Sequence, residues 1–359
     1  CMLQFVKTVH RTAENIAAML HPAVDSDSKL PLVREALAEL ERAMLVRKGD
    51  DGYRIPSPVE DDWERSRSAL EPKTSERNQI LAETLNGFWD PQPSQTLNGV
   101  KLFKAGLLVN GKELLEGDLP VSVYLTGEGQ DYRDQVEELR RRSQVEKFTI
   151  FWAASLAPVL DEEVVQFFRS KEILRLRERD ARTPDQGHLV VEERHRLSRH
   201  REEIRRRLRE ALLSGSVFFR GNDRSPEGGT GVDTTVKGLL GQALPEVYHR
   251  FEEAASKVEA RDLSSLLTAD SLQGLSPLFS RLHLLKEEGG KTLFAADQAP
   301  LSEVFIRIKN RTDYGDSATG RYLEEVFHKE PFGWDFDMVK LLVLCLLRAG
   351  KIEATGGGS

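Results

Sequence analysis

Cysteine is scarce in this chain of 359 residues. The only two cysteines, Cys1 and Cys345, lie at opposite ends of the sequence, and Cys345 falls inside an apolar run. This excludes the disulfide framework of small secreted domains and makes a reducing compartment the simplest context. Two cysteines also supply too few thiolates for most structural zinc sites, so we predict no structural metal.

Long apolar runs and an excess of positive charge are also missing. The longest uncharged apolar run, around residues 341–347, is far shorter than the roughly 20 residues of a membrane-spanning helix. The first residues lack a signal-peptide pattern. The formal net charge of −7 disfavours a protein that wraps nucleic acid through a global positive charge. We therefore expect a cytoplasmic protein with no membrane partner.

What the chain contains is a succession of short helical and strand patterns. Apolar residues recur at helical spacing after residue 31, and residues 46–55 then read as strand, turn and strand. With a helix over residues 5–19, this pattern is typical of a winged helix-turn-helix. Residues 301–349 predict three more helices that end in a strand at Lys351 and Ile352, which resembles a second winged helix truncated at its wing.

The predicted fold class is α+β and predominantly helical. Two winged-helix-like units flank a small α/β region and a long helical hairpin. The expected organisation is a winged-helix-like unit (1–60), a linker (61–96), a small α/β region (97–155), a charged helical hairpin (156–214), a mixed, mostly helical region (215–300) and a truncated winged-helix-like unit (301–359). The helix over residues 339–347 is apolar on every side, so we expect it to be buried in a larger body and the chain to be a segment of a longer protein.

Two motifs suggest ligand sites but lack the required spacing. Gly289 to Thr292 ends like a phosphate-binding P-loop, but that loop needs a glycine where Leu285 stands, and a helix must follow it. A hairpin turn is the better prediction, and no ATP site is visible. His195 and His200 lie five residues apart, whereas a zinc site on one helix face needs histidines four apart. We expect them, with His188, to be solvated or interface residues.

Acidic and hydroxyl residues near two helix starts also have ordinary explanations. Ser317 lacks the strand–turn–helix context of a nucleophilic serine and is expected to cap a helix that starts near Ala318. Asp335 and Asp337 are expected at the N-terminus of a helix, where they favour its dipole. A paired-carboxylate metal site is the alternative for these two residues.

Arginine gathers in the predicted hairpin although the chain as a whole is acidic. Such clusters can neutralise the phosphates of a nucleic acid. The alternative is a solvated helix face whose arginines pair internally with Glu192, Glu202 and Glu203. The candidate nucleic-acid contacts are Arg194, Arg196, Arg199, Arg201, Arg205, Arg206 and Arg209 on the hairpin, with Arg47 and Lys48 on the first predicted wing.

The helix before that wing argues against a role in DNA binding. It carries Glu35, Glu39 and Glu41, whose charge would repel phosphates. We therefore favour a protein-contact role for the first winged-helix-like unit.

Several segments in the second half of the chain match the sequence pattern of a known family. They are VEARDL (258–263), LLTAD (266–270), NRTDYG (310–315), ATGRYL (318–323), PFGW (331–334) and LLRAGKI (346–352), and residues 215–221 and 244–251 also fit. On these segments, of which the last is the most specific, the chain resembles the BrxC/PglY family, the large P-loop ATPases of bacterial BREX phage-defence systems.

This resemblance implies an AAA+-like ATPase module N-terminal to the present segment. That module would hold the Walker motifs with ATP and Mg²⁺, so the resemblance assigns no nucleotide-binding, cofactor-binding or catalytic residue to this chain. It implies a scaffold that contacts double-stranded DNA or other BREX components, in a protein that forms homo-oligomers through its ATPase. The alternative is a pure protein–protein assembly module of the same or another large AAA+ ATPase, with no DNA contact.

Overall fold

The computed structural model describes residues 9–23, 27–43, 45–49, 52–226, 228 and 231–355. Helices make up 54% of the chain and strands about 16%, which confirms an α+β, predominantly helical class. The chain divides into two compact units. One, here called the hairpin unit, comprises Cys1–Leu81 and Val159–Arg205, and the other, the sheet unit, comprises Ala82–Pro158 and Arg206–Ser359.

The hairpin unit begins with two helices and a small antiparallel hairpin. These are α1 (Ala13–Met19), α2 (Leu30–Arg42), β1 (Arg47–Gly49) and β2 (Gly52–Arg54). Val33 and Leu37 of α2 are buried against Ala13 and Ala17 of α1. The helix and hairpin predicted over residues 31–55 are confirmed.

The first predicted helix is shorter than expected. It starts at Ala13 because Thr12 caps it, with the Thr12 hydroxyl accepting a hydrogen bond from the Asn15 amide at 3.2 Å. Residues 5–8 of the prediction lie outside the described residues. Arg11 instead pairs with Gly52, whose φ of +95° suits glycine. A Cβ at Gly52 would lie 2.3 Å from the Arg11 carbonyl carbon, so the close approach also requires glycine.

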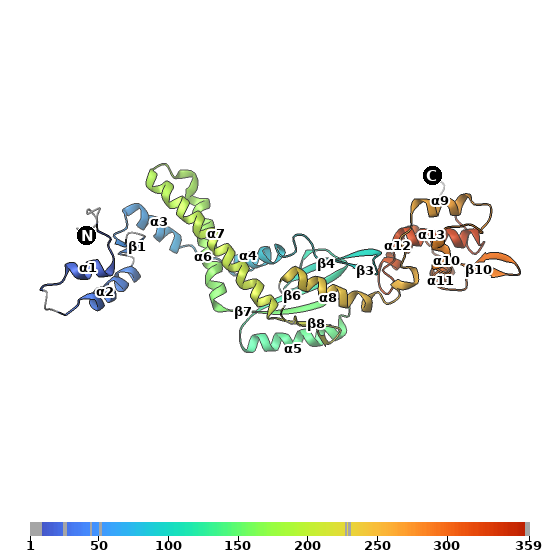
Figure 1. The fold of residues 1–359 in the computed structure, drawn as a ribbon, viewed down its shortest axis with the longest axis horizontal. Helices are drawn as coiled ribbons and strands as arrows, with labels where there is room; N and C mark the ends of the chain where they lie inside the picture. Colours follow the sequence, from blue (N-terminus) through green and yellow to red (C-terminus); the bar gives the residue numbers. More distant parts are fainter. Residues whose placement is uncertain are drawn as a thin grey trace. The chain divides into compact units, whose positions relative to one another are not determined.

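The remainder of the hairpin unit is helical. α6 (Pro158–Arg177) and α7 (Pro184–Leu213) run side by side (Figure 1), as predicted, with a short 3₁₀ helix (Glu178–Asp180) after α6. The break between the helices ends earlier than expected, because Pro184 occupies the first turn of α7, where a missing N–H costs nothing.

The stretch expected as a linker, residues 61–96, consists mostly of regular secondary structure. This stretch contains most of α3 (Pro58–Ser68), α4 (Thr74–Asn86) and β3 (Ser94–Leu97). Ser57 and Glu60 form a capping box at the start of α3. The Trp63 ring is buried in a cluster with Ile173, Leu174, Leu189 and Val190, so α3 packs on the helical hairpin.

A seven-stranded mixed sheet forms the middle of the sheet unit. Its strands are β3, β4 (Lys101–Val109), β5 (Lys112–Leu115), β6 (Leu119–Gly127), β7 (Ile150–Leu156), β8 (Ser216–Phe219) and β9 (Asn222–Asp223). The order is β3-β4-β6-β7-β8-β9, with β5 also paired to β4. The pairs β4–β6 and β6–β7 are parallel, and the others are antiparallel.

Both faces of the central strands are covered. α5 (Gln130–Val145) lies on one face, where Leu139 packs with Phe151 and Phe218. Successive strand residues point to opposite faces, and the next residue, Trp152, donates a hydrogen bond to the Leu212 carbonyl at 3.0 Å. Residues 150–154 are therefore all buried, as expected for a strand covered on both sides.

The rest of the sheet unit is mainly helical. It contains α8 (Val232–Val247), a 3₁₀ helix (Phe251–Ala254), α9 (Ala260–Thr268), α10 (Pro277–Arg281), β10 (Leu285–Glu288), β11 (Lys291–Phe294), α11 (Leu301–Asp313), α12 (Gly320–His328) and α13 (Phe336–Arg348). The hairpin turn predicted at Gly289 and Gly290 is confirmed. Met338, Val339, Leu341, Leu342, Cys345 and Leu346 of α13 are buried, as expected for an apolar helix.

Two local predictions in this region are wrong. Thr319, and not Ser317, caps α12, because the Thr319 hydroxyl reaches the Tyr322 amide at 3.2 Å. Lys351 and Ile352 do not form a strand in the described part of the chain, since residues 351–355 have no strand partner. Asp335 and Asp337 do lie at the N-terminus of α13, as predicted.

Candidate nucleic-acid interface on the helical hairpin

The predicted nucleic-acid contacts lie on two elements that the sequence identified. Seven of these residues are on α7 and two are on β1. Most are exposed, but Arg47 and Arg196 are partly buried. The partners of these side chains therefore decide whether a phosphate could reach them.

Arg196 is surrounded by carboxylates of the same chain. Its guanidinium lies 2.7 Å from a Glu192 carboxylate oxygen, 3.5 Å from Glu193 and 3.4 Å from Glu64 on α3. Burial opposes the charge of Arg196, but these three carboxylates outweigh it and raise its pKa. A phosphate at Arg196 would have to displace partners that are already in place.

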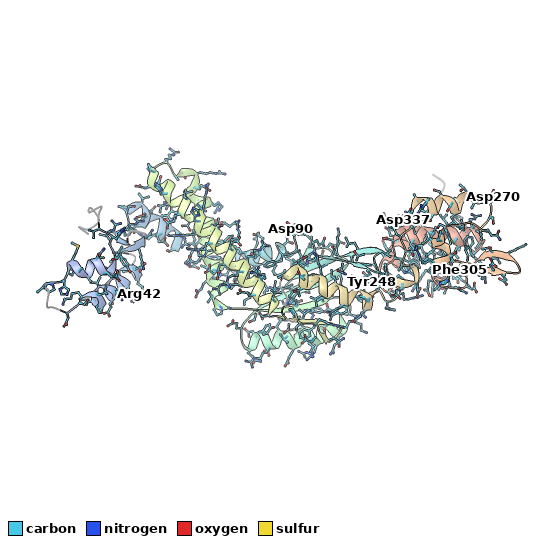
Figure 2. All side chains as sticks on the ribbon, viewed as in Figure 1. Arg42, Asp90, Tyr248, Asp270, Phe305 and Asp337 are labelled. Atoms are coloured by element: carbon cyan, nitrogen blue, oxygen red, sulfur yellow. The ribbon has the colours of Figure 1, made fainter. Side chains whose placement is uncertain are left out.

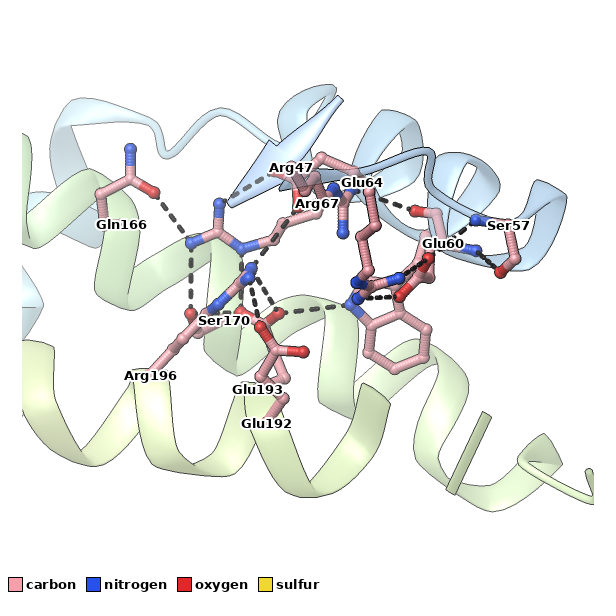
Figure 3. Close-up of polar contacts among 12 residues, drawn as sticks. Arg47, Ser57, Glu60, Glu64, Arg67, Gln166, Ser170, Glu192, Glu193 and Arg196 are labelled. Atoms are coloured by element: carbon pink, nitrogen blue, oxygen red, sulfur yellow. Dashed lines mark hydrogen bonds and ion pairs between the residues drawn. The ribbon is translucent and has the colours of Figure 1, made fainter. Parts of the chain in front are cut away.

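Glu193 lies at the centre of this arrangement (Figure 3). Its side chain is only 2% exposed. The carboxylate accepts hydrogen bonds from Trp63 Nε1 at 3.2 Å, Arg67 Nε at 2.8 Å and Ser170 Oγ at 2.5 Å. Burial alone would raise the pKa of Glu193, but the Ser170 hydroxyl and the Arg67 charge outweigh it and hold that pKa below its ordinary value.

Arg67 completes the cluster from α3. Its Nη2 donates to Gln166 Oε1 at 2.8 Å, and its Nη1 lies 3.5 Å from Glu64. Three helices, α3, α6 and α7, therefore meet at one buried, hydrogen-bonded ion pair between Arg67 and Glu193. This ion cluster, defined by Trp63, Arg67, Ser170, Glu193 and Arg196, fastens α3 to the helical hairpin.

Other arginines of α7 also have partners within the chain. Arg194 pairs with Glu178, and Arg206 pairs with Glu210 at 2.7 Å. The Arg201 guanidinium lies over the Phe167 ring, 5.8 Å from its centroid. Arg199, Arg205 and Arg209 are exposed, and Arg205 also has an interaction within the chain. The internal pair expected with Glu192 is confirmed, but the sequence did not indicate the partners Glu64, Glu178, Glu193 and Glu210.

The predicted wing is held by α3. Arg47 Nη2 lies 3.6 Å from the Glu64 carboxylate and donates to the Glu60 carbonyl at 3.3 Å. Arg54, on the neighbouring strand, forms a bidentate pair with Glu60 at 2.6 and 2.5 Å, which lowers the pKa of Glu60. Lys48 is exposed. Arg47 therefore faces a helix of the same unit rather than an open surface.

Histidine forms no metal site among the residues that the structure describes. His200 Nδ1 lies 2.6 Å from Glu163 Oε2 on α6, which makes it an interhelical contact. No group of three or more His, Cys, Asp or Glu side chains in the described ranges could hold a metal ion.

Sequence reasoning missed a second polar cluster, in the sheet unit. Lys101 Nζ on β4 donates to the Gly333 carbonyl at 3.0 Å and to His328 Nδ1 at 3.1 Å. His328 Nε2 lies 3.4 Å from Asp118 Oδ1. Burial lowers the pKa of Lys101, opposed by the charges of Asp335 and Asp118. The cluster ties the turn before α13 to the sheet.

No local pattern could have indicated this second cluster. Lys101 and His328 are 227 positions apart, and each is an ordinary residue in its own segment. Gly333 lies against Phe103 of β4 and against Tyr248, and this long-range packing places Lys101 and His328 together.

Comparisons with protein-family models, with curated proteins and with solved structures find no match. Among the helices that the structure describes, none combines the length and the apolar character that a membrane crossing requires.

Proposed function

We propose that this chain is a non-catalytic, partner-contacting scaffold of a BREX-type antiphage defence ATPase of the BrxC/PglY family. The sequence resemblance over residues 258–352 supports the family assignment. By that resemblance, ATP and Mg²⁺ are bound by a module outside this sequence, and other BREX components are the partners.

The observation that carries the scaffold role is the pairing of the hairpin arginines with carboxylates. Arg194, Arg196 and Arg206 each have an acidic partner in the chain, and Arg67 and Glu193 fasten α3 to the hairpin. Paired arginines contribute less to phosphate binding, because each must exchange one anion for another. The charged hairpin is thus better suited to holding helices together than to attracting DNA.

DNA contact through the hairpin is the second candidate. Its support is the exposure of Arg199, Arg205 and Arg209 on α7. Three positive charges are too few to offset the net charge of −7 of the chain, but their contribution to DNA binding can be tested.

A titration of fluorescent duplex DNA across a salt series separates the two candidates. Each neutralised phosphate contributes about −0.9 to the slope of log K against log salt. We expect weak binding with a slope shallower than about −2, unchanged when Arg199, Arg205 and Arg209 are replaced by Glu. A matched control reverses three exposed arginines elsewhere, Arg133, Arg141 and Arg321. A steep slope that only the hairpin variant abolishes would instead establish the DNA-contacting role.

The family assignment has its own test in the host cell. Deleting the gene should raise the plating efficiency of phages that the host resists, and a plasmid copy should restore resistance. Unchanged plating across a phage panel would overturn the assignment to a defence system without bearing on the DNA titration.

A further inference from the structure

We infer that the exposed face of α2 is a docking surface for a basic amphipathic helix of a partner protein. This inference rests on the proposed function only for the idea that the chain contacts partners. The surface is a stripe of Leu32, Ala36, Leu40 and Ala43, bordered by Glu35 and Glu39, and is here called the α2 stripe.

The spacing of the stripe shows that α2 is apolar on two adjacent faces. Leu32, Ala36 and Leu40 recur every four residues, so they lie on one side of the helix. Leu32 is 63% exposed and Leu40 is 38% exposed. Val33 and Leu37, one position further on in each turn, are already buried against α1. The face with Val33 and Leu37 is buried against α1, and the face with Leu32 and Leu40 is left at the surface.

The charge beside the stripe disfavours a nucleic acid and indicates the occupant. Glu35 and Glu39 are exposed and lie next to the leucines on the helix surface. Of the two arginines on α2, Arg34 pairs with Glu14 at 2.8 Å, and Arg42 stands at the C-terminal end (Figure 2). Carboxylates at this position repel phosphates and attract Lys or Arg side chains.

The wing next to α2 supports the same conclusion. If these elements form a winged helix, α2 is the helix that would enter a DNA groove, with the wing beside it. Arg47 on β1 is held by Glu64 of α3, and Arg54 on β2 by Glu60. Neither the helix nor these arginines present the positive charge that DNA binding needs.

The chemistry of the surface defines its partner. An amphipathic helix with an apolar stripe bordered by Lys or Arg would bury the leucines and pair with Glu35 and Glu39, as in a short coiled coil. The stripe from Leu32 to Ala43 extends for about 17 Å at the rise of an α-helix. Such a contact is small for a protein–protein interface, so we expect a transient complex of micromolar affinity.

Designed peptides provide the probe. The basic probe is a fluorescein-labelled helix of about three heptads with Leu at a and d and Lys at e and g, and its counterpart has Glu at e and g. Anisotropy with the full chain should show binding of the basic probe on the order of 10 µM, and binding of the acidic probe at least about tenfold weaker.

Matched variants assign the binding to the α2 stripe. The double variant Leu32→Glu/Leu40→Glu should weaken binding of the basic probe at least about tenfold. Leu267→Glu is the control, because the side chain of Leu267 on α9 is 64% exposed and that of Leu32 is 63% exposed. The variant Glu35→Lys/Glu39→Lys should reverse the preference between the two probes, and since it keeps the leucines, it tests charge without removing the apolar stripe.

Three outcomes would overturn the inference. The first is equal binding of the two probes, and the second is binding that the leucine variant does not change. The third is a dimer in sedimentation that is lost in the leucine variant, which would assign the face to a second copy of the chain. Hydrogen exchange across α1 and α2 confirms that each variant is folded. None of these readouts depends on DNA binding or phage resistance, so failure here would leave the tests of the proposed function unaffected.

Discussion

The hairpin unit and the sheet unit each fasten a segment that is distant in sequence, and they do so by different physical means. In the hairpin unit, α3 is fixed to α6 and α7 by the ion pair of Arg67 and Glu193, beside the buried Trp63 ring. In the sheet unit, residues 331–334 are fixed by the packing of the Phe327, Phe332 and Trp334 rings and by hydrogen bonds from Lys101 to the Gly333 and Trp334 carbonyls. An ion pair is directional and fails when either partner is removed, whereas aromatic burial depends mainly on area and shape.

The aromatic cluster of the sheet unit consists of three rings, and the guanidiniums of Arg250 and Arg307 lie over one of them, Phe332. The rings of Phe327 and Trp334 are nearly parallel, with centroids 4.9 Å apart, and Phe332 packs on both. Trp334 Nε1 donates to the Arg250 carbonyl at 3.1 Å, so the indole N–H is satisfied. All three rings are almost fully buried. We therefore expect the stability of the aromatic cluster to depend mainly on buried volume, and the stability of the ion cluster to depend mainly on charge pairing.

The largest effect is expected for Trp334→Ala. Removing a buried Trp costs about 3–5 kcal/mol, and the lost hydrogen bond places this variant toward the upper end. Hydrogen exchange with mass spectrometry should show increased opening of α12 and α13. Tyr314→Ala is the matched control, since Tyr314 is 89% exposed, and it should change stability by less than about 0.5 kcal/mol. Similar losses for both variants would contradict the volume argument.

Glu193→Ala should have the next largest effect. Breaking a buried ion pair costs about 3–5 kcal/mol, and we expect the lower end because Glu64 stays 3.5 Å from Arg67. The readout is the free energy of opening of α3 and α7 by hydrogen exchange.

The double variant Arg67→Met/Glu193→Met tests whether charge, and not volume, dominates at this site. Replacing both ions by apolar groups of similar size should recover most of the loss, because no unpaired charge remains. A double variant as unstable as Glu193→Ala would mean that the hydrogen bonds to Trp63 and Ser170 carry the contact instead.

Acid should weaken the attachment of α3 within the hairpin unit. The folded-state pKa of Glu193 is lowered from 4.5, so its contribution to stability is fully present above that value and is lost as the pH falls toward the folded pKa. Opening of α3 should therefore increase as the pH is lowered below about 4.5. Glu193→Gln removes this titration, and its α3 should open with a flatter pH profile. Identical profiles in the two proteins would assign the acid sensitivity to other carboxylates.

The sequence indicated the elements well and their long-range partners poorly. The helical hairpin, the turn at Gly289 and the burial of α13 follow from local periodicity and turn residues. The docking of α3 does not, because Trp63 and Glu193 are 130 positions apart and a charged helix is equally consistent with a linker. The arginines of α7 were correctly placed on one helix, but their carboxylate partners depend on how α3 and α6 pack against it.

An exposed ion pair in the hairpin unit should contribute least. Arg175 and Glu172 lie 2.7 Å apart on α6, and their side chains are 66% and 19% exposed, so the arginine end of the pair is open to water. Water and salt screen such a pair, and holding two long side chains costs entropy, so Arg175→Ala should change stability by less than about 0.5 kcal/mol. Denaturant unfolding of this variant at low and high salt measures the difference, which should vanish at high salt. A loss comparable to that of Glu193→Ala would mean that burial does not distinguish the two ion pairs, and the charge dependence of the hairpin unit would then extend over its whole surface.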